Sequence, residues 1–241
     1  MKKVEENNRI IKEELEKIKE LRVTDSDTLQ RNNKYFRPVA FDGESKIKRR
    51  NIDIIMRHCS TTVNDIYVSS RCNLKAKELH KIDTLVSKSY KKMKITKREN
   101  KPVIYVINNF EMQKGAVASY NPVTNVLILD ENFAKDIERI KLIQKDGDCI
   151  DNELSTVVHE LFHWIDAQEY QKHFGKITTQ KQYNEYIKHL NEKRKKIIEK
   201  LGINEYNVTK ISKYANDSFD DLDFDEVYTE YRVKTLLEGR L

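Results

Sequence analysis

The amino-acid sequence predicts a mostly helical α+β protein, and three observations lead to this class. Glycine and proline are scarce, with 6 and 3 residues among 241, while 35% of the residues are charged. This composition is typical of soluble, helix-rich proteins. Most of the chain repeats its apolar residues at the spacing of helical faces. Between residues 102 and 130, however, short runs rich in β-branched residues alternate with turn-forming residues, which indicates a small sheet.

The first hundred residues are expected to contain three helices and a linker. Residues 3–21 place apolar side chains at helical spacing over about two heptads, which is too short to establish a coiled coil. Residues 24–50 are polar and contain a proline and a glycine, so we expect a linker or an irregular loop there. Apolar residues recur on one helical face in residues 51–68 and again in residues 74–93, which predicts two further helices.

The apolar period changes after residue 100. Residues 102–107 form a short run rich in β-branched residues, which predicts a buried strand. Two further runs follow at residues 115–120 and 125–130. The Asn-Pro-Val-Thr sequence between them has turn chemistry, so these runs are expected to pair as a β-hairpin.

More helices are expected towards the C-terminus. They cover residues 131–144, a stretch that includes residues 155–166, residues 180–201 and residues 224–238. Asp151 or Asn152 can cap the second of these helices, and Gly202 stands where the third is expected to end. We therefore divide the chain into an N-terminal helical, basic region of residues 1–98 and a second domain of residues 99–241.

The charge of the chain is uneven. The first 100 residues hold 25 lysines and arginines against 15 aspartates and glutamates, whereas the remaining residues hold 20 against 24. A basic first half could contact nucleic acid or an acidic partner. Its lysines are scattered without interleaved aromatic residues, which favours a solvated surface over a nucleic-acid site.

The sequence also bears on the cellular location. The N-terminus lacks the apolar segment of a secretory signal, and no apolar run reaches membrane-spanning length. We therefore expect a cytoplasmic protein, or one released by a non-classical route, without a membrane partner. Cys59, Cys72 and Cys149 are an odd number of cysteines without paired spacing, which fits reduced thiols better than a disulfide framework.

The strongest signal for chemistry lies in residues 155–166. His159 and His163 are four residues apart, so on a helix they share a face and can bind one metal ion. Glu160 is the residue type that takes a proton from metal-bound water. The flanking residues are apolar, and buried imidazoles need partners. The pattern predicts one zinc ion per chain; the alternative is a surface helix with solvated histidines, which the apolar flanks disfavour.

Four stretches of the chain resemble the anthrax lethal-factor-like gluzincins, a group that includes secreted Pro-Pro endopeptidases and relatives in bacterial and phage genomes. They are the His-Glu-Leu-Phe-His-Trp-Ile-Asp motif at residues 159–166, the hairpin at 119–128, the segment 211–215 and the Asp-Glu-Val-Tyr-Thr-Glu sequence at 225–230. The resemblance covers about residues 100–238 and is specific at the His-Glu helix. It implies that residues 99–241 form a zincin-like metallopeptidase domain, with a small sheet, an active-site helix and a C-terminal helical lobe.

The resemblance also implies a third zinc ligand. The family pattern places it at the first glutamate of a Glu-x-x-x-Glu pair, here Glu226, and lets the second, Glu230, steady a ligand from behind. Asp225 and Glu230 remain alternatives for the ligand itself. Asp223 and Glu226 also have the spacing of a capping box, so this acidic stretch could be a solvated loop. Asp166 matches the family's aspartate at that position and is expected to anchor the helix or a loop, or to have an exposed structural role.

Tyr214 matches a tyrosine that donates a hydrogen bond to the oxyanion in the resembling enzymes. The segment between it and Glu226 is longer than the family spacing, so a tyrosine that only packs is the alternative. The substrate-binding strand is expected at Gly115, Ala116, Val117, Ala118, Ser119 and Tyr120. Its small residues would let a peptide backbone add to the sheet edge; alternatively, they only pack beneath the helical lobe.

These observations predict a zinc-dependent endopeptidase that hydrolyses a peptide or protein substrate. Glu160 is expected to be the general base and Tyr214 the oxyanion donor. Two alternatives remain. The first is a catalytically silent phage or mobile-element protein that keeps the fold for a structural or binding role. The second is a nucleic-acid-binding protein that uses the basic N-terminal half.

Overall fold

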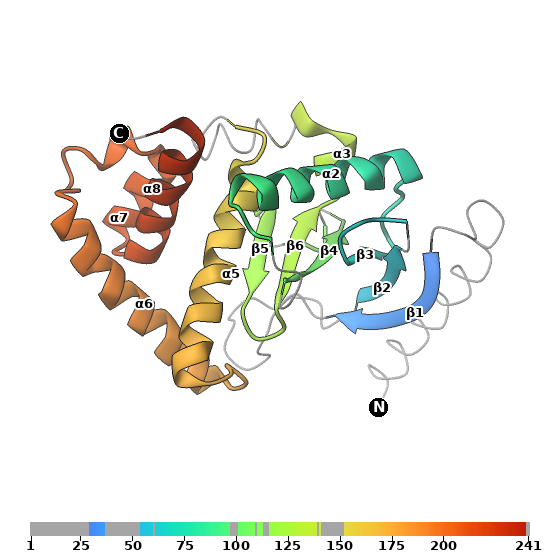
Figure 1. Cartoon of the computed structure of the whole chain (residues 1–241), viewed down its shortest axis with the longest axis horizontal. Helices are drawn as coiled ribbons and strands as arrows, with labels where there is room; N and C mark the ends of the chain where they lie inside the picture. The colour runs from blue at the N-terminus through green and yellow to red at the C-terminus, as the bar shows by residue number, and fades with distance from the viewer. Residues whose placement is uncertain are drawn as a thin grey trace.

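The computed structural model describes residues 29–36, 54–59, 61–96, 101–108, 110–112, 116–138, 140 and 152–239. These residues form an α+β structure with a mixed sheet on one side and a helical lobe on the other (Figure 1). The elements are β1 (Leu29–Phe36), β2 (Ile54–Cys59), β3 (Ile66–Ser69), α2 (Ala76–Lys92), β4 (Val103–Ile107), β5 (Ala118–Asn121), β6 (Val126–Asp130), α3 (Asn132–Lys135), α5 (Ser155–Phe174), α6 (Gln180–Lys200), the 3-10 turn η2 (Val208–Lys210), α7 (Lys213–Asp220) and α8 (Phe224–Glu238).

The sheet has the strand order β1-β2-β3-β4-β6-β5. Its centre is parallel, because β4 pairs in parallel with both β3 and β6. The outer pairs β1–β2, β2–β3 and β5–β6 are antiparallel. The central strands β4 and β6 are nearly continuous apolar runs, as strands covered on both faces require. This order leaves β5 at the edge of the sheet beside α5 (Figure 1).

The prediction of a helix at residues 51–68 is wrong. The structure has β2 and β3 there, paired antiparallel with Cys59 opposite Ile66. Asp83 on α2 fixes the connection between the strands, because its carboxylate accepts hydrogen bonds from the backbone N–H groups of Val63 and Asn64 at 2.9 and 3.0 Å. A short apolar pattern fits a helix or two strands, and the packing of this segment on α2 decides between them.

The expected linker and the expected domain boundary also need correction. Strand β1 lies within residues 24–50 and pairs with β2. The sheet then continues from β3 to β4, across the division expected at residue 98. Ile66 and Ile82 share one buried core with Ile104 on β4 and Leu161 on α5. The described residues between 54 and 96 are therefore part of the same packed body as the His-Glu helix.

The other expected elements are confirmed where the structure describes them. These are α2, β4, the β5–β6 hairpin, α6 and α8. Gly202 adopts a φ of 69° just after α6, the left-handed conformation that glycine allows at a helix end. The expected helix 131–144 is confirmed only in part, because α3 ends at Lys135 and Asp136 leaves the helical conformation; residues 139 and 141–144 lie outside the described residues. The expected helix 3–21, Gly115 and Cys149 lie outside the described residues, while Cys59 and Cys72 are buried free thiols.

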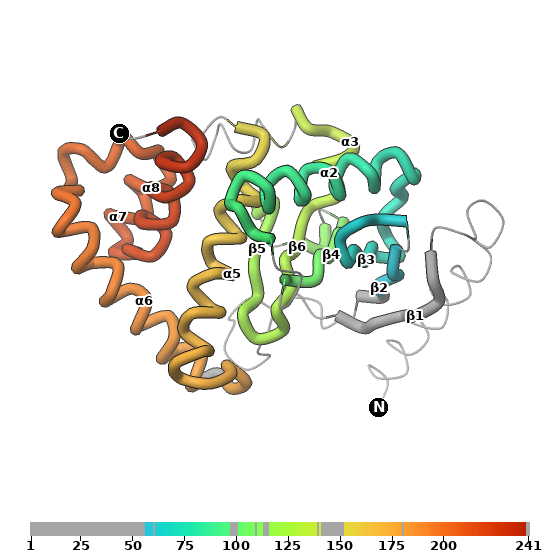
Figure 2. Tube along the Cα trace, in the orientation of Figure 1, coloured from blue at the N-terminus to red at the C-terminus, as the bar shows by residue number. Residues whose placement is uncertain are grey.

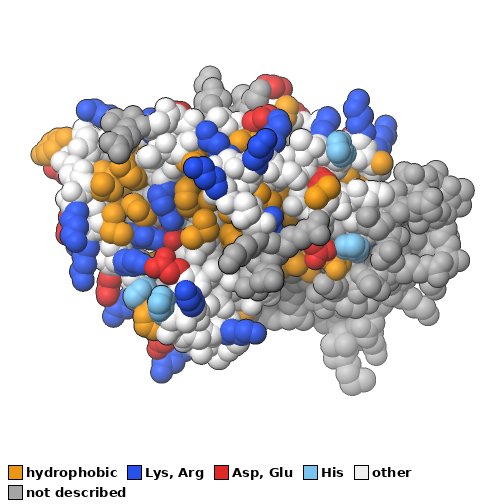
Figure 3. Space-filling model, in the orientation of Figure 1, with side chains coloured by type: hydrophobic (Ala, Val, Ile, Leu, Met, Phe, Trp, Pro, Cys, Tyr) orange, Lys and Arg blue, Asp and Glu red, His pale blue; other side chains and the backbone are white. Residues whose placement is uncertain are grey.

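The helical lobe places α8 between α5, α6 and α7 (Figures 1 and 2). Helix α7 was not among the elements expected from the sequence. Ser212 caps it by accepting a hydrogen bond from the backbone N–H of Ala215 at 2.9 Å. Within the part of the chain that the structure describes, no helix is both long and apolar enough to cross a membrane. Basic side chains are scattered over the face in Figure 3 and form no single patch there.

Candidate metal centre

Helix α5 carries the two histidines on its less buried side. Asn152 forms a turn before the helix, where its side-chain oxygen accepts a hydrogen bond from the backbone N–H of Leu154 at 2.9 Å. The N-cap residue is Leu154, without a side-chain cap, so the cap expected at Asn152 is wrong, and Asp151 lies outside the described residues. The helix is packed into the protein through the fully buried residues Val157, Val158, Leu161 and Ala167. This burial fixes the rotation of α5, so His159 and His163 both face α8 across the helix interface.

The two imidazoles and Glu226 converge on one point. Nε2 of His159 lies 3.0 Å from Nε2 of His163. Oε2 of Glu226 lies 2.9 Å from the former nitrogen, and Oε1 lies 3.2 Å from the latter. Ligand atoms of these three residues all lie within 4.8 Å of one another, so the group could hold a metal ion.

A second pair of carboxylates sets the orientation of the imidazoles. Nδ1 of His159 lies 2.8 Å from Oε1 of Glu230, and Nδ1 of His163 lies 3.4 Å from Oδ2 of Asp225. A carboxylate beside Nδ1 holds the proton on that nitrogen, which leaves the lone pair on Nε2. Of the three candidates for the third ligand, therefore, Glu226 faces the shared point, whereas Asp225 and Glu230 lie behind the histidines.

The three converging groups are all electron-pair donors, so they repel one another unless a cation lies between them. Two Nε2 lone pairs and a carboxylate face each other, and Oε2 of Glu226 is buried without a hydrogen bond of good geometry despite its closeness to His159. Such convergence is unfavourable unless a positive charge lies between the groups. Two imidazole nitrogens and one carboxylate oxygen are also a ligand set that catalytic zinc uses. The residues present thus fit a divalent metal ion.

The pKa values show the same attraction for positive charge. Burial lowers the pKa of His159, but the carboxylates of Glu226 and Glu230 together outweigh burial and raise the pKa to about 10. Burial also lowers the pKa of His163 and the charge of Glu226 raises it, and the resulting pKa is well above its usual value. Burial raises the pKa of Glu226, yet the charges of His163 and His159 hold it well below its usual range. The site therefore binds protons tightly, and a metal ion must compete with them.

Glu160 lies beside this centre and outside its ligand group. The side chain is buried, and burial raises its pKa, while the charges of His159 and His163 act in the opposite direction. The backbone N–H of Tyr120 on β5 donates a hydrogen bond to the carboxylate. The edge strand and the His-Glu helix therefore meet at this glutamate.

Tyr214 reaches the centre despite its distance along the chain. Its ring centroid is 6.0 Å from that of His159, and 36% of the residue is exposed. Burial, followed by the carboxylates of Glu226 and Glu160, raises the pKa of its phenol. The longer segment before Glu226 is accommodated because it folds into α7. Ser212, at the start of α7, donates a hydrogen bond to Oε2 of Glu230 at 2.9 Å and so ties this helix to the site.

Asp166 is buried, with 3% of the residue exposed, so the expected exposed structural role is wrong. Arg194 on α6 lies 2.5 Å from Oδ1, and Arg232 on α8 lies 2.6 Å from Oδ2. Burial raises the pKa of Asp166, but Arg232 and Arg194 outweigh it and lower the value. Asp166 thus anchors α5 to both neighbouring helices, which is the anchoring role that the sequence analysis gave as one of two expectations.

The expected substrate strand is described from Ala116 onwards. The backbone N–H of Asp130 donates to the carbonyl of Val117 at 2.9 Å. Because the hydrogen-bonding direction alternates along an antiparallel pair, the N–H groups of Ala118 and Tyr120 point away from β6. The N–H of Tyr120 is used by Glu160. The side chain of Ala118 is buried in the core, so at this position the edge strand β5 presents its backbone, and not a side chain, to a possible peptide.

Reasoning from the sequence missed several supporting residues. Asp225 was considered only as a ligand, and Ser212, Arg194 and Arg232 were not considered. The Ser-x-x-Ala spacing at the start of α7 is a weak capping signal for Ser212. No local pattern marks the two arginines, because their partner Asp166 comes from another helix.

Comparisons of the chain with protein-family models, with curated proteins and with solved structures give no match.

Proposed function

We propose that this protein is a zinc-dependent endopeptidase with a zincin-like fold, similar to the lethal-factor-like gluzincins. One observation carries the proposal: Nε2 of His159, Nε2 of His163 and the carboxylate of Glu226 converge within 4.8 Å, with carboxylates behind both imidazoles. The chain order of a sheet, the His-Glu helix and a helical lobe supports it further, as does the position of Glu160 beside the ligand group.

His159, His163 and Glu226 would hold the zinc ion. Bound there, zinc would supply a Lewis acid for the scissile carbonyl and lower the pKa of a water molecule towards neutrality. The remaining chemistry belongs to this chain's own residues. Glu160 would take the proton of the water on its carboxylate and pass it to the leaving amine.

Two further groups complete the proposed site. The hydroxyl of Tyr214 would donate a hydrogen bond to the oxyanion that develops on the peptide carbonyl. The backbone N–H of Ala118, which points away from β6, would pair with an extended peptide as an added strand. The substrate would then lie along β5, the strand whose residue Tyr120 contacts the proposed base through its backbone.

The test combines metal analysis with peptide digestion. Protein purified without chelator is expected to contain about one zinc per chain and to cleave a proteome-derived peptide library, with loss of cleavage after chelation. Glu160→Gln should keep the metal and lose cleavage, because an amide cannot accept the proton. Absence of any transition metal, or a fully active Glu160→Gln protein, would overturn the proposal.

A further inference from the structure

A buried network of charged residues lies behind the metal centre. It joins Asp166 on α5, Arg194 on α6 and two residues of α8, Asp225 and Arg232. Arg194 is only 5% exposed. Its Nη2 lies 2.5 Å from Oδ1 of Asp166, and its Nε lies 3.5 Å from Oδ1 of Asp225. The second contact is an ion pair without a hydrogen bond, because neither of its two atoms has a hydrogen-bond partner among the described residues. One guanidinium therefore lies between two carboxylates from different helices.

The two arginines differ in one respect that bears on the metal. Both contact Asp166, and both guanidinium groups lie over the ring of Tyr228, at 4.5 Å for Arg194 and 4.9 Å for Arg232. Of the two, only Arg194 reaches Asp225. The other oxygen of Asp225, Oδ2, faces Nδ1 of His163. Arg194 therefore contacts Asp225, and Asp225 in turn contacts the imidazole of His163.

The geometry points to Arg194 as a positioning residue of the metal centre, which orients His163 by holding the carboxylate of Asp225. The inference rests on the metal site of the proposed function. A buried carboxylate without a cationic partner is costly. Without Arg194, the carboxylate of Asp225 could rotate away and would no longer hold the Nδ1 proton of His163. Loss of such an outer partner typically weakens metal binding by about 10- to 100-fold.

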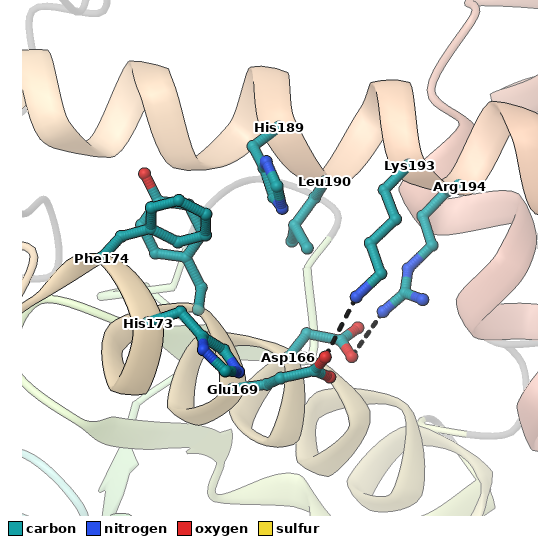
Figure 4. Close-up of a pocket in the computed structure, with 9 residues that line it drawn as sticks. Asp166, Glu169, His173, Phe174, His189, Leu190, Lys193 and Arg194 are labelled. Carbon is teal, nitrogen blue, oxygen red and sulfur yellow. Dashed lines mark hydrogen bonds and ion pairs between the residues drawn. The ribbon is translucent and has the colours of Figure 1, made fainter.

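The space around Arg194 makes this test feasible. A cavity of about 250 Å³ lies between α5 and α6, and Asp166 and Arg194 line one end of it (Figure 4). Neither His159, His163 nor Glu226 lines this cavity. A shorter side chain at position 194 would let water hydrate Asp166 from the cavity, but water cannot hold Asp225 in one orientation. Arg194→Gln is therefore expected to fold and to bind metal less tightly.

The experiment compares Arg194→Gln with Arg232→Gln in the full chain. Affinities for Zn²⁺ and Co²⁺ are measured by competition with a chelating dye, together with the melting temperature. Arg194→Gln should weaken binding by about 10- to 100-fold. Arg232→Gln removes contacts to Asp166 and Thr229 but none to Asp225, so it should change the affinity by less than about threefold. Equal losses in the two variants, or parental affinity in Arg194→Gln, would show that Arg194 is only structural.

A double-mutant cycle with Asp225→Asn checks the route through Asp225. Asp225→Asn should itself weaken binding, and adding Arg194→Gln should then cost little more, because coupled residues do not act additively. Parental affinity in Asp225→Asn overturns the inference even if Arg194→Gln does not fold. A parent protein that binds no metal overturns this inference and the proposed function together. A parent that binds metal but cleaves no peptide removes the proposed function and leaves this inference standing.

Discussion

Glu230 contacts His159 from the side opposite the metal-facing nitrogen, with 2.8 Å between Oε1 and Nδ1. Its other oxygen accepts a hydrogen bond from Ser212 at 2.9 Å, so the carboxylate is held at both ends. Glu230→Gln removes the charge but keeps the size, and it should weaken zinc binding by about 10- to 100-fold. Competition with a chelating dye measures this. Parental affinity in Glu230→Gln would show that the contact does not tune the ligand.

Glu226→Ala should weaken zinc binding far more than Glu230→Gln, because it removes a ligand atom and not a supporting contact. Asp221→Ala is the matched control, since Asp221 is exposed at the end of α7 and lies outside the ligand group. Elemental analysis after dialysis gives the zinc content of each variant. If Glu226→Ala kept its zinc while Asp225→Ala lost it, the ligand would be the neighbouring residue.

The loss of activity at low pH should reflect the pKa of Glu160. Burial raises the pKa of this carboxyl group, and the group accepts a proton only as a carboxylate. Activity should therefore fall as the pH drops through a pKa above the ordinary glutamate value of about 4.3. The measurement is kcat/KM against pH, with zinc content checked at each point. A limb at the ordinary value, with zinc retained, would argue against Glu160 as the base.

Tyr214→Phe should reduce turnover by about 100-fold or more, the usual cost of losing one oxyanion donor. Zinc content and melting temperature should change little, because the ring next to His159 is kept. Steady-state kinetics on a cleaved peptide measures the effect. Tyr206→Phe provides a control, because that exposed tyrosine lies outside the candidate site. An unchanged rate in Tyr214→Phe would assign Tyr214 to packing.

Ala118→Pro removes the one backbone donor that the substrate is proposed to use. That N–H points away from β6, so proline does not remove a hydrogen bond of the sheet. Cleavage should fall strongly while zinc content and the circular dichroism spectrum stay close to those of the parent. A folded, zinc-loaded Ala118→Pro protein with normal cleavage would exclude backbone pairing through this group.

The sequence alone was sufficient wherever the decisive interactions are local. The spacing of His159 and His163 places both on one helical face by the geometry of the helix itself. The hairpin of β5 and β6 follows from the turn residues between the two strands, and the bounds of α8 agree with its apolar period. These features depend on residues that are close together along the chain, so a local pattern can predict them.

Only the tertiary structure decided which carboxylate of α8 faces the histidines. Asp225 and Glu226 differ by about 100° around the helix, and Glu230 lies about one turn beyond Glu226. The rotation of α8 is set by distant contacts, including Arg232 with Asp166 and the packing of Val233 against Val158. The strands β2 and β3 and the approach of Tyr214 depend on long-range packing in the same way. Such contacts form only when separate elements meet, so no local pattern contains them.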